Sequence, residues 1–233
     1  AGWEKDEDGI WHYYDSDDEM VTDEWRKDGS KWFYLDEDGN MATDAWVDDE
    51  YYVGADGAMI KNDWIKTTAD EDVSDPEDDG DNWYYFGSNG KKVEDDSKKI
   101  NGKTYYFNED GEMRYGWYED NGDVFYLGGE DEGWRAESQW LWLALPDEDE
   151  VDRNSVSFCD DDSTCSVSCD EEGWYYFGSN GKMYRDASKK KVNGKYYFFN
   201  AHGQMLYEWI NNQKYAVSSS SDLVSGNYTD TQG

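Results

Sequence analysis

The sequence predicts an all-β fold, an elongated β-solenoid of stacked β-hairpin repeats. Aromatic blocks such as Trp32–Leu35 recur at a short period, and turn sequences rich in Asp, Asn and Gly bound them. No stretch keeps the apolar 3.6-residue period of a helix over three turns. Because a single hairpin is only marginally stable in water, we expect about eight or nine hairpins, each burying its aromatic face on the next.

The aromatic blocks are the expected strands, since Trp, Tyr and Phe favour extended backbone. Asx/Gly sequences, which supply the positive φ of a tight turn, follow the blocks directly. The clearest blocks are 32–35, 83–86, 104–107 and 196–199, followed by the turns 36–39, 87–90, 108–111 and 200–203.

The methionines give an independent check on the register of the repeat, because a fixed spacing between Met and the aromatic blocks is not expected by chance. Each of the six Met residues stands nine positions after the first residue of an aromatic-rich block. The pairs are Met20 with Trp11, Met41 with Trp32, Met59 with Glu50, Met113 with Thr104, Met183 with Trp174 and Met205 with Tyr196.

A longer period overlies the short one. The nonapeptide WYYFGSNGK occupies Trp83–Lys91 and again Trp174–Lys182. Two acidic inserts, 66–82 and 146–173, precede these copies and are predicted to be solvated loops. The hairpin repeats therefore span 1–217, and 218–233 is predicted to be a flexible tail.

The composition narrows the class of partner. A formal charge of −35 opposes binding to nucleic acid and anionic lipid, which need a positive surface. Aromatic residues make up 18% of the chain and only two prolines occur, which argues against disorder. No apolar run reaches the length of a membrane helix. The abrupt start at Ala1 favours an excised piece of a longer secreted protein.

The sequence contains no recognisable catalytic motif and no metal-ligand pattern. No G-x-S-x-G or H-E-x-x-H motif occurs, and His12 and His202 lie in different repeats, so we expect no enzyme, no metal site and no cofactor. The acidic turns lack the EF-hand order of ligands. Cys159, Cys165 and Cys169 can form one disulfide at most, which leaves one thiol over, and their pairing stays open.

The segment Trp32–Trp46, WFYLDEDGNMATDAW, carries a family resemblance. Its order of aromatic block, Gly turn, Met and following Trp resembles the choline-binding, or cell-wall-binding, repeats of Gram-positive bacterial surface proteins. Glucan-binding repeats of streptococcal glucosyltransferases and C-terminal repeats of clostridial toxins are similar. The resemblance covers roughly 2–215 and implies choline sites between successive hairpins.

Each site in the family joins a Trp on the first strand of a hairpin, a Trp on its second strand and a Tyr of the next hairpin, with a Met at the floor. The resemblance implies the cages Trp3, Trp11 and Tyr34; Trp25, Trp32 and Tyr52; Trp64, Trp83 and Tyr106; and Trp140, Trp174 and Tyr197, with Met20 and Met41 near the first two. Glu50, Thr104 and Val124 replace the second-strand Trp elsewhere, so those hairpins are expected to be structural.

The implied function is a non-catalytic, extracellular, cell-surface module that attaches to choline-bearing teichoic acid or another cell-wall polymer. Aromatic ring faces recognise a quaternary ammonium because it cannot donate a hydrogen bond. Two alternatives stay open. The first is a module for a glucan or host glycan, favoured by the hairpins that lack the cage Trp. The second is an adhesin for a host protein, favoured by the acidic inserts.

Overall fold

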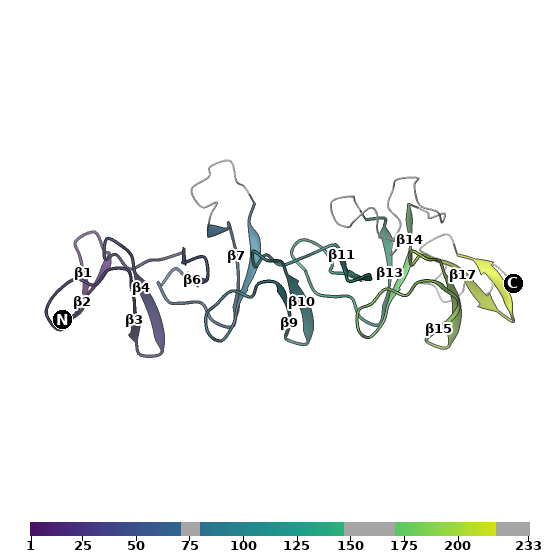
Figure 1. Cartoon of the computed structure of the whole chain (residues 1–233), viewed down its shortest axis with the longest axis horizontal. Helices are drawn as coiled ribbons and strands as arrows, with labels where there is room; N and C mark the ends of the chain where they lie inside the picture. The colour runs from purple at the N-terminus through teal and green to yellow at the C-terminus, as the bar shows by residue number, and fades with distance from the viewer. Residues whose placement is uncertain (71–79, 147–170, 218–233) are drawn as a thin grey trace. The chain divides into compact units, whose positions relative to one another are not determined.

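The structure is a computed structural model that describes residues 1–70, 80–146 and 171–217. In this part of the chain the strands form nine consecutive antiparallel pairs, which confirms the prediction of an all-β hairpin repeat (Figure 1). The chain divides into two compact units, Ala1–Lys98 with Phe107–Met113, and Lys99–Tyr106 with Arg114–Gly233.

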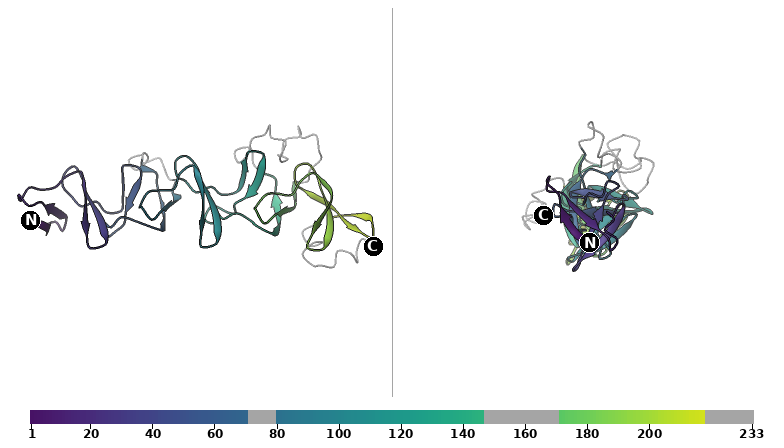
Figure 2. Two further views of the ribbon diagram at one scale, coloured as in Figure 1. Left: turned by 60° about the horizontal axis from the view of Figure 1, so that its bottom comes forward. Right: turned by 90° about the vertical axis from the view of Figure 1, so that its left-hand side faces the viewer.

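The first unit contains four complete hairpins that follow one another in chain order (Figures 1 and 2). Their strands are β1 (Gly2–Lys5) and β2 (Trp11–Tyr14), β3 (Glu24–Asp28) and β4 (Lys31–Leu35), β5 (Ala45–Val47) and β6 (Tyr51–Val53), and β7 (Asp63–Thr67) and β8 (Asn82–Phe86). The next hairpin, β9 (Asp96–Ile100) with β10 (Lys103–Phe107), has residues in both units.

The second unit combines a separate hairpin with a six-stranded sheet of order β13-β14-β17-β16-β15, in which β18 also pairs with β17. Its strands are β11 (Trp117–Asp120), β12 (Asp123–Tyr126), β13 (Gln139–Ala144), β14 (Glu172–Phe177), β15 (Ala187–Val192), β16 (Lys195–Phe199), β17 (Met205–Ile210) and β18 (Gln213–Ala216).

The core of each unit runs along the fourth position of the aromatic blocks. Alternation along a strand places this position on the face opposite to the third. Tyr14 of the first block is partly exposed. From the second block on, the side chains at this position are at most 2% exposed: Leu35, Val53, Phe86 and Phe107 in the first unit, and Leu127, Phe177 and Phe199 in the second. Hairpins thus bury a continuous apolar row on their neighbours within a unit.

The acidic turns are held by their own first side chain. Oδ1 of Asp36 accepts hydrogen bonds from the backbone N–H groups of Asp38 and Asn40, both at 2.9 Å. Asn108 forms the same pair with Asp110 and Glu112. These Asx turns account for the acidic sequence as turn chemistry. Among the described residues no group of three or more His, Cys, Asp or Glu has metal-site geometry.

The strands begin and end inside the predicted inserts. Thr67, the last residue of β7, pairs with Asn82, the first residue of β8, and β14 begins at Glu172, so the outer residues of 66–82 and 146–173 belong to strands. Segments 71–79 and 147–170, which include the three cysteines, and the tail 218–233 lie outside the described residues. Within the described part, no helix has the length and apolarity needed to cross a membrane.

Candidate functional site

One backbone hydrogen bond per repeat fixes each hairpin against the next. The residue at the Met position donates its N–H to the carbonyl of the first block residue in the preceding hairpin. In three repeats the donor is a Met and the acceptor is the Trp on the second strand of the preceding hairpin, so this bond sets the Met next to that Trp. Such bonds join Met41 to Trp11 (2.9 Å), Met59 to Trp32 (2.8 Å) and Met113 to Trp83 (2.8 Å).

The first hairpin interface encloses a pocket of about 240 Å³. Trp3 of β1, Trp11 of β2, Phe33 of β4 and Met41 form its apolar wall. The rings of Trp3 and Phe33 meet edge to face, with centroids 5.5 Å apart, and Trp11 is 38% exposed. The pocket is therefore an open aromatic cage of the size that a small organic cation needs.

Two carboxylates, of Asp28 and Asp56, complete this pocket. A hydrogen bond from the N–H of Ala58 is the main cause that lowers the pKa of Asp56, and Lys31, 3.1 Å away, adds to it. Asp56 is therefore ionised at neutral pH, and the pocket presents ring faces together with negative charge. Both features favour a cation.

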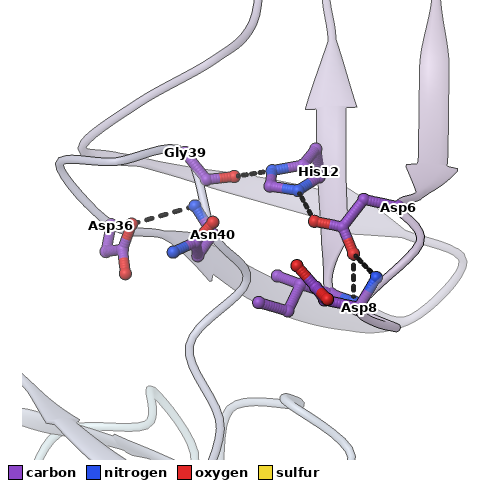
Figure 3. A network of polar contacts seen from close by, with 7 residues as sticks. Asp6, Asp8, His12, Asp36, Gly39 and Asn40 are labelled. Carbon is purple, nitrogen blue, oxygen red and sulfur yellow. Dashed lines mark hydrogen bonds and ion pairs between the residues drawn. The ribbon is translucent and has the colours of Figure 1, made fainter.

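His12 ties the first hairpin to the turn of the second (Figure 3). Its Nδ1–H donates to the carbonyl oxygen of Gly39 at 2.8 Å, and Nε2 lies 2.8 Å from Oδ2 of Asp6. The contact with Asp6 is the main cause that raises the pKa of His12, and it lowers the pKa of Asp6. The ion pair thus braces the strand that carries Trp11.

The second interface repeats the arrangement. Trp25 of β3 and Tyr51 of β6 meet at 5.4 Å, and Trp32 of β4 holds the backbone of Met59. These four side chains are each partly exposed.

The structure brings residues to the first two interfaces that differ in part from those predicted. Phe33 and Tyr51, at the second block position, face the preceding Trp, whereas Tyr34 and Tyr52, at the third, pack on Trp25 (5.2 Å) and Trp46 (5.5 Å) within their own hairpins. A shift of one residue turns a strand side chain to the other face. The methionines at the two interfaces also differ from those predicted. Met41 lines the first pocket, where we expected Met20, and Met59 lies at the second interface, where we expected Met41.

The third predicted cage is only partly assembled in the first unit. Trp64 and Trp83 lie at right angles with centroids 6.3 Å apart, and Phe107 packs on Trp64 at 5.7 Å. Tyr106 belongs to the second unit, where its ring contacts Tyr118 at 5.1 Å.

The fourth predicted cage brings its three residues together. Trp140 lies 6.5 Å from Trp174 and 4.8 Å from Tyr197. Trp174 and Tyr197 are only 5% and 3% exposed, and Trp142 covers Trp174 at 5.6 Å. This cluster is packed far more tightly than the first.

At two of the three interfaces where the second-strand Trp is replaced, a cation also replaces the Met. Lys92 stands in the Met position against Glu50, and its Nζ lies 5.4 Å from the ring centroid of Trp46 and 3.0 Å from Asp49. The Lys92 side chain is 4% exposed, so the interface encloses a cation of the protein's own.

A second cation fills the equivalent interface in the second unit. Arg135 stands in the Met position against Thr104, 5.9 Å from the Phe125 ring, and donates to the hydroxyl of Tyr106 at 2.9 Å. At the remaining replaced position, Val124 and Met183 join one buried apolar cluster. For Lys92 the sequence did carry a signal, because it stands nine residues after Trp83, where most other aromatic blocks place a Met.

Comparison with protein families identifies the repeat. Models of the choline-binding repeat match residues 19–59, 40–68 and 95–140, and a cell wall binding repeat model matches 1–17, 77–92, 169–183 and 190–205. Together they cover most of the chain. The comparison with curated proteins gave no match.

Solved structures from Streptococcus pneumoniae share the fold. The choline-binding domain of CbpL is 26% identical, with a TM-score of 0.52 over 88% of this chain and 96% of that domain. Choline binding protein F is 23% identical, with a TM-score of 0.54 over 88% of this chain. The match spans only 57% of choline binding protein F.

Proposed function

The chain belongs to the choline-binding, or cell-wall-binding, repeat family of Gram-positive surface proteins and is a choline-binding repeat module, and we propose which of its aromatic clusters hold choline. The main site is the pocket of Trp3, Trp11, Phe33 and Met41, and the second is formed by Trp25, Trp32, Tyr51 and Met59.

The first pocket carries this proposal. A trimethylammonium group has no N–H to donate, so its affinity depends on ring faces and nearby negative charge, each ring contributing about 0.5–2 kcal/mol. Trp3, Trp11 and Phe33 supply the rings, while Asp28 and Asp56 supply the charge.

Repetition supplies the strength that one cage lacks. A single site near −4 kcal/mol binds at about the millimolar level. Teichoic acid presents many cholines on one polymer, so several occupied cages raise the effective affinity without new contacts. The Trp64–Trp83 and Trp140–Trp174 clusters are the further candidates, and the buried rings of the second imply weaker or slower binding there. Attachment through such cages associates the protein with the bacterial cell wall.

We infer that the chain acts by binding and not by catalysis. The matched segments are binding repeats. The carboxylates of Asp6, Asp15 and Asp36 are engaged by backbone N–H groups of their own turns, which leaves them a structural role.

Replacement of Trp11 by Ala tests the main site. We expect choline to quench the tryptophan fluorescence of the parent chain at millimolar concentration, and the variant to show a weaker response with a lower total choline capacity. Tyr115→Ala, at a half-exposed position outside the clusters, is the matched control and should leave binding unchanged.

Two further ligands separate the function classes. Tetramethylammonium should compete with choline, since the ring faces recognise the cation. An α-glucan should not compete. If the glucan binds and choline gives no response up to high millimolar in the folded chain, the site takes a sugar and the choline assignment is wrong.

A further inference from the structure

We propose that the outer face of the C-terminal sheet, strands β15 to β18, is a second binding surface that takes the phosphate backbone of an anionic wall polymer without the help of choline. The proposal rests on the proposed function, because it assumes that the polymer is a teichoic acid.

Charge is distributed unevenly along the chain. Residues 187–217 carry five lysines against one glutamate, a net charge of +4, which leaves −39 on the rest of a chain whose total is −35. The one carboxylate in this segment, Glu208, is 2% exposed. The C-terminal sheet is therefore a basic surface in an acidic protein.

Strand register places the basic residues in a row with aromatic rings. Lys191 of β15 pairs with Tyr196 of β16, Tyr196 pairs with Trp209 of β17, and Trp209 pairs with Lys214 of β18. Directly paired residues share one face of a sheet. Glu208, one position away from Trp209, points to the opposite face.

The ammonium groups are ordered by these rings. Nζ of Lys214 lies 5.8 Å from the Trp209 ring centroid and 5.0 Å from that of Tyr207, and Nζ of Lys191 lies 5.9 Å from Tyr196. Lys189 adds a third cation, 5.1 Å from Trp209. Ring contacts hold an ammonium without neutralising it, and within the described residues no carboxylate pairs with these three lysines.

The spacing fits a polymer better than a single phosphate. The backbones of Lys191 and Lys214 stand three strand spacings apart, about 14 Å, and their ammonium groups lie over the rings of Tyr196 and Trp209 between them. Tyr196 is 39% exposed, so its ring is accessible. An extended polyol phosphate can place two phosphates on the cations while its carbon chain crosses the rings.

The negative charge elsewhere does not prevent this contact. At physiological ionic strength the Debye length is about 8 Å, so acidic groups farther away are largely screened. The surface should therefore bind locally, with an affinity that falls as salt rises.

The test uses the whole chain and choline-free poly(glycerol phosphate) as the probe, with binding followed by calorimetry at low and at physiological salt. The variant replaces Lys189, Lys191 and Lys214 by Gln. The control replaces Lys61, Lys91 and Lys182 by Gln, which removes the same charge from exposed positions outside the sheet. We expect the first triple variant to lose affinity roughly ten-fold or more, and the control to stay close to the parent chain.

Three results would overturn the proposal: no binding of the probe by the parent chain at low salt, an equal loss in both triple variants, or a concentration-dependent association of the parent chain that only the first variant abolishes. The last result would assign the face to a second copy of the chain. Choline titration of the same variants separates the two proposals, because the aromatic cages retain every residue and should respond as before.

Discussion

The interface around Trp46 offers a direct way to build a choline site. The ammonium of Lys92 fills this interface. Glu50 stands where other repeats carry Trp, and its Oε1 forms an ion pair with Nζ of Lys91 at 2.8 Å. The double variant Glu50→Trp with Lys92→Met restores the residue types of the first two sites. The ring of Tyr84, 4.8 Å from Trp46, is already in place.

The expected gain follows from the rings. Removing the ammonium frees the face of Trp46 and the new Trp adds another, each worth about 0.5–2 kcal/mol for a cation. Together with Tyr84 they should reach about −4 kcal/mol, a dissociation constant near 1 mM. Loss of the Lys92–Asp49 pair should cost only about 0–1 kcal/mol, since Asp49 is exposed and regains water.

Equilibrium dialysis with labelled choline at saturating concentration measures the change. The double variant should bind one more choline per chain than the parent, and Lys92→Met alone should bind at most weakly at this interface. Lys91→Met serves as the control for loss of a neighbouring lysine. An unchanged number of bound cholines in a folded double variant would refute the idea that Lys92 replaces the ligand.

Three more predictions concern stability. The raised pKa of His12 means that its pair with Asp6 stabilises the fold fully below about pH 6.5 and is lost as pH rises through the folded-state pKa. The protection of the first hairpin's amides, taken relative to their intrinsic exchange rate at each pH, should therefore fall on going to pH 9, and His12→Gln should remove that fall. Gly57→Ala should destabilise the fold and lower its melting temperature. The φ of +80° alone should cost about 1–2 kcal/mol of folding free energy, and a Cβ placed 2.8 Å from Met41 should add to this. Gly29→Ala, whose Cβ would meet open space, is the control that measures the backbone strain alone. Burial raises the pKa of Glu208, so its charged form opposes folding as pH rises above about 4.3, and Glu208→Gln should raise the melting temperature more at pH 8 than at pH 5.

The repeat was predictable because its signals are local. Aromatic blocks and Asx/Gly turns determine strand and turn with little help from the rest of the chain. At Asn101–Gly102, for example, φ values of +51° and +82° give the two-residue turn that Asn-Gly favours. The family and the hairpin architecture followed from these signals, and both are confirmed.

The site was harder to predict because it depends on which face of a strand meets the neighbouring hairpin. Tyr34 and Phe33 are adjacent in sequence and similar in chemistry, yet only Phe33 lines the first pocket. The sequence alone does not say which of two alternating faces packs on which neighbour. Asp28 and Asp56 were missed because many other carboxylates occupy similar places, Asp28 at the end of a strand next to a turn and Asp56 within a turn.

The most direct test of the account is to locate choline in the first pocket by nuclear Overhauser effects in the full chain at saturating choline. We expect transfer from the choline methyl protons to the ring protons of Trp3, Trp11 and Phe33 and to the methyl of Met41. Transfer to Tyr34 instead, or no transfer to any ring of this pocket while the chain remains folded, would contradict it.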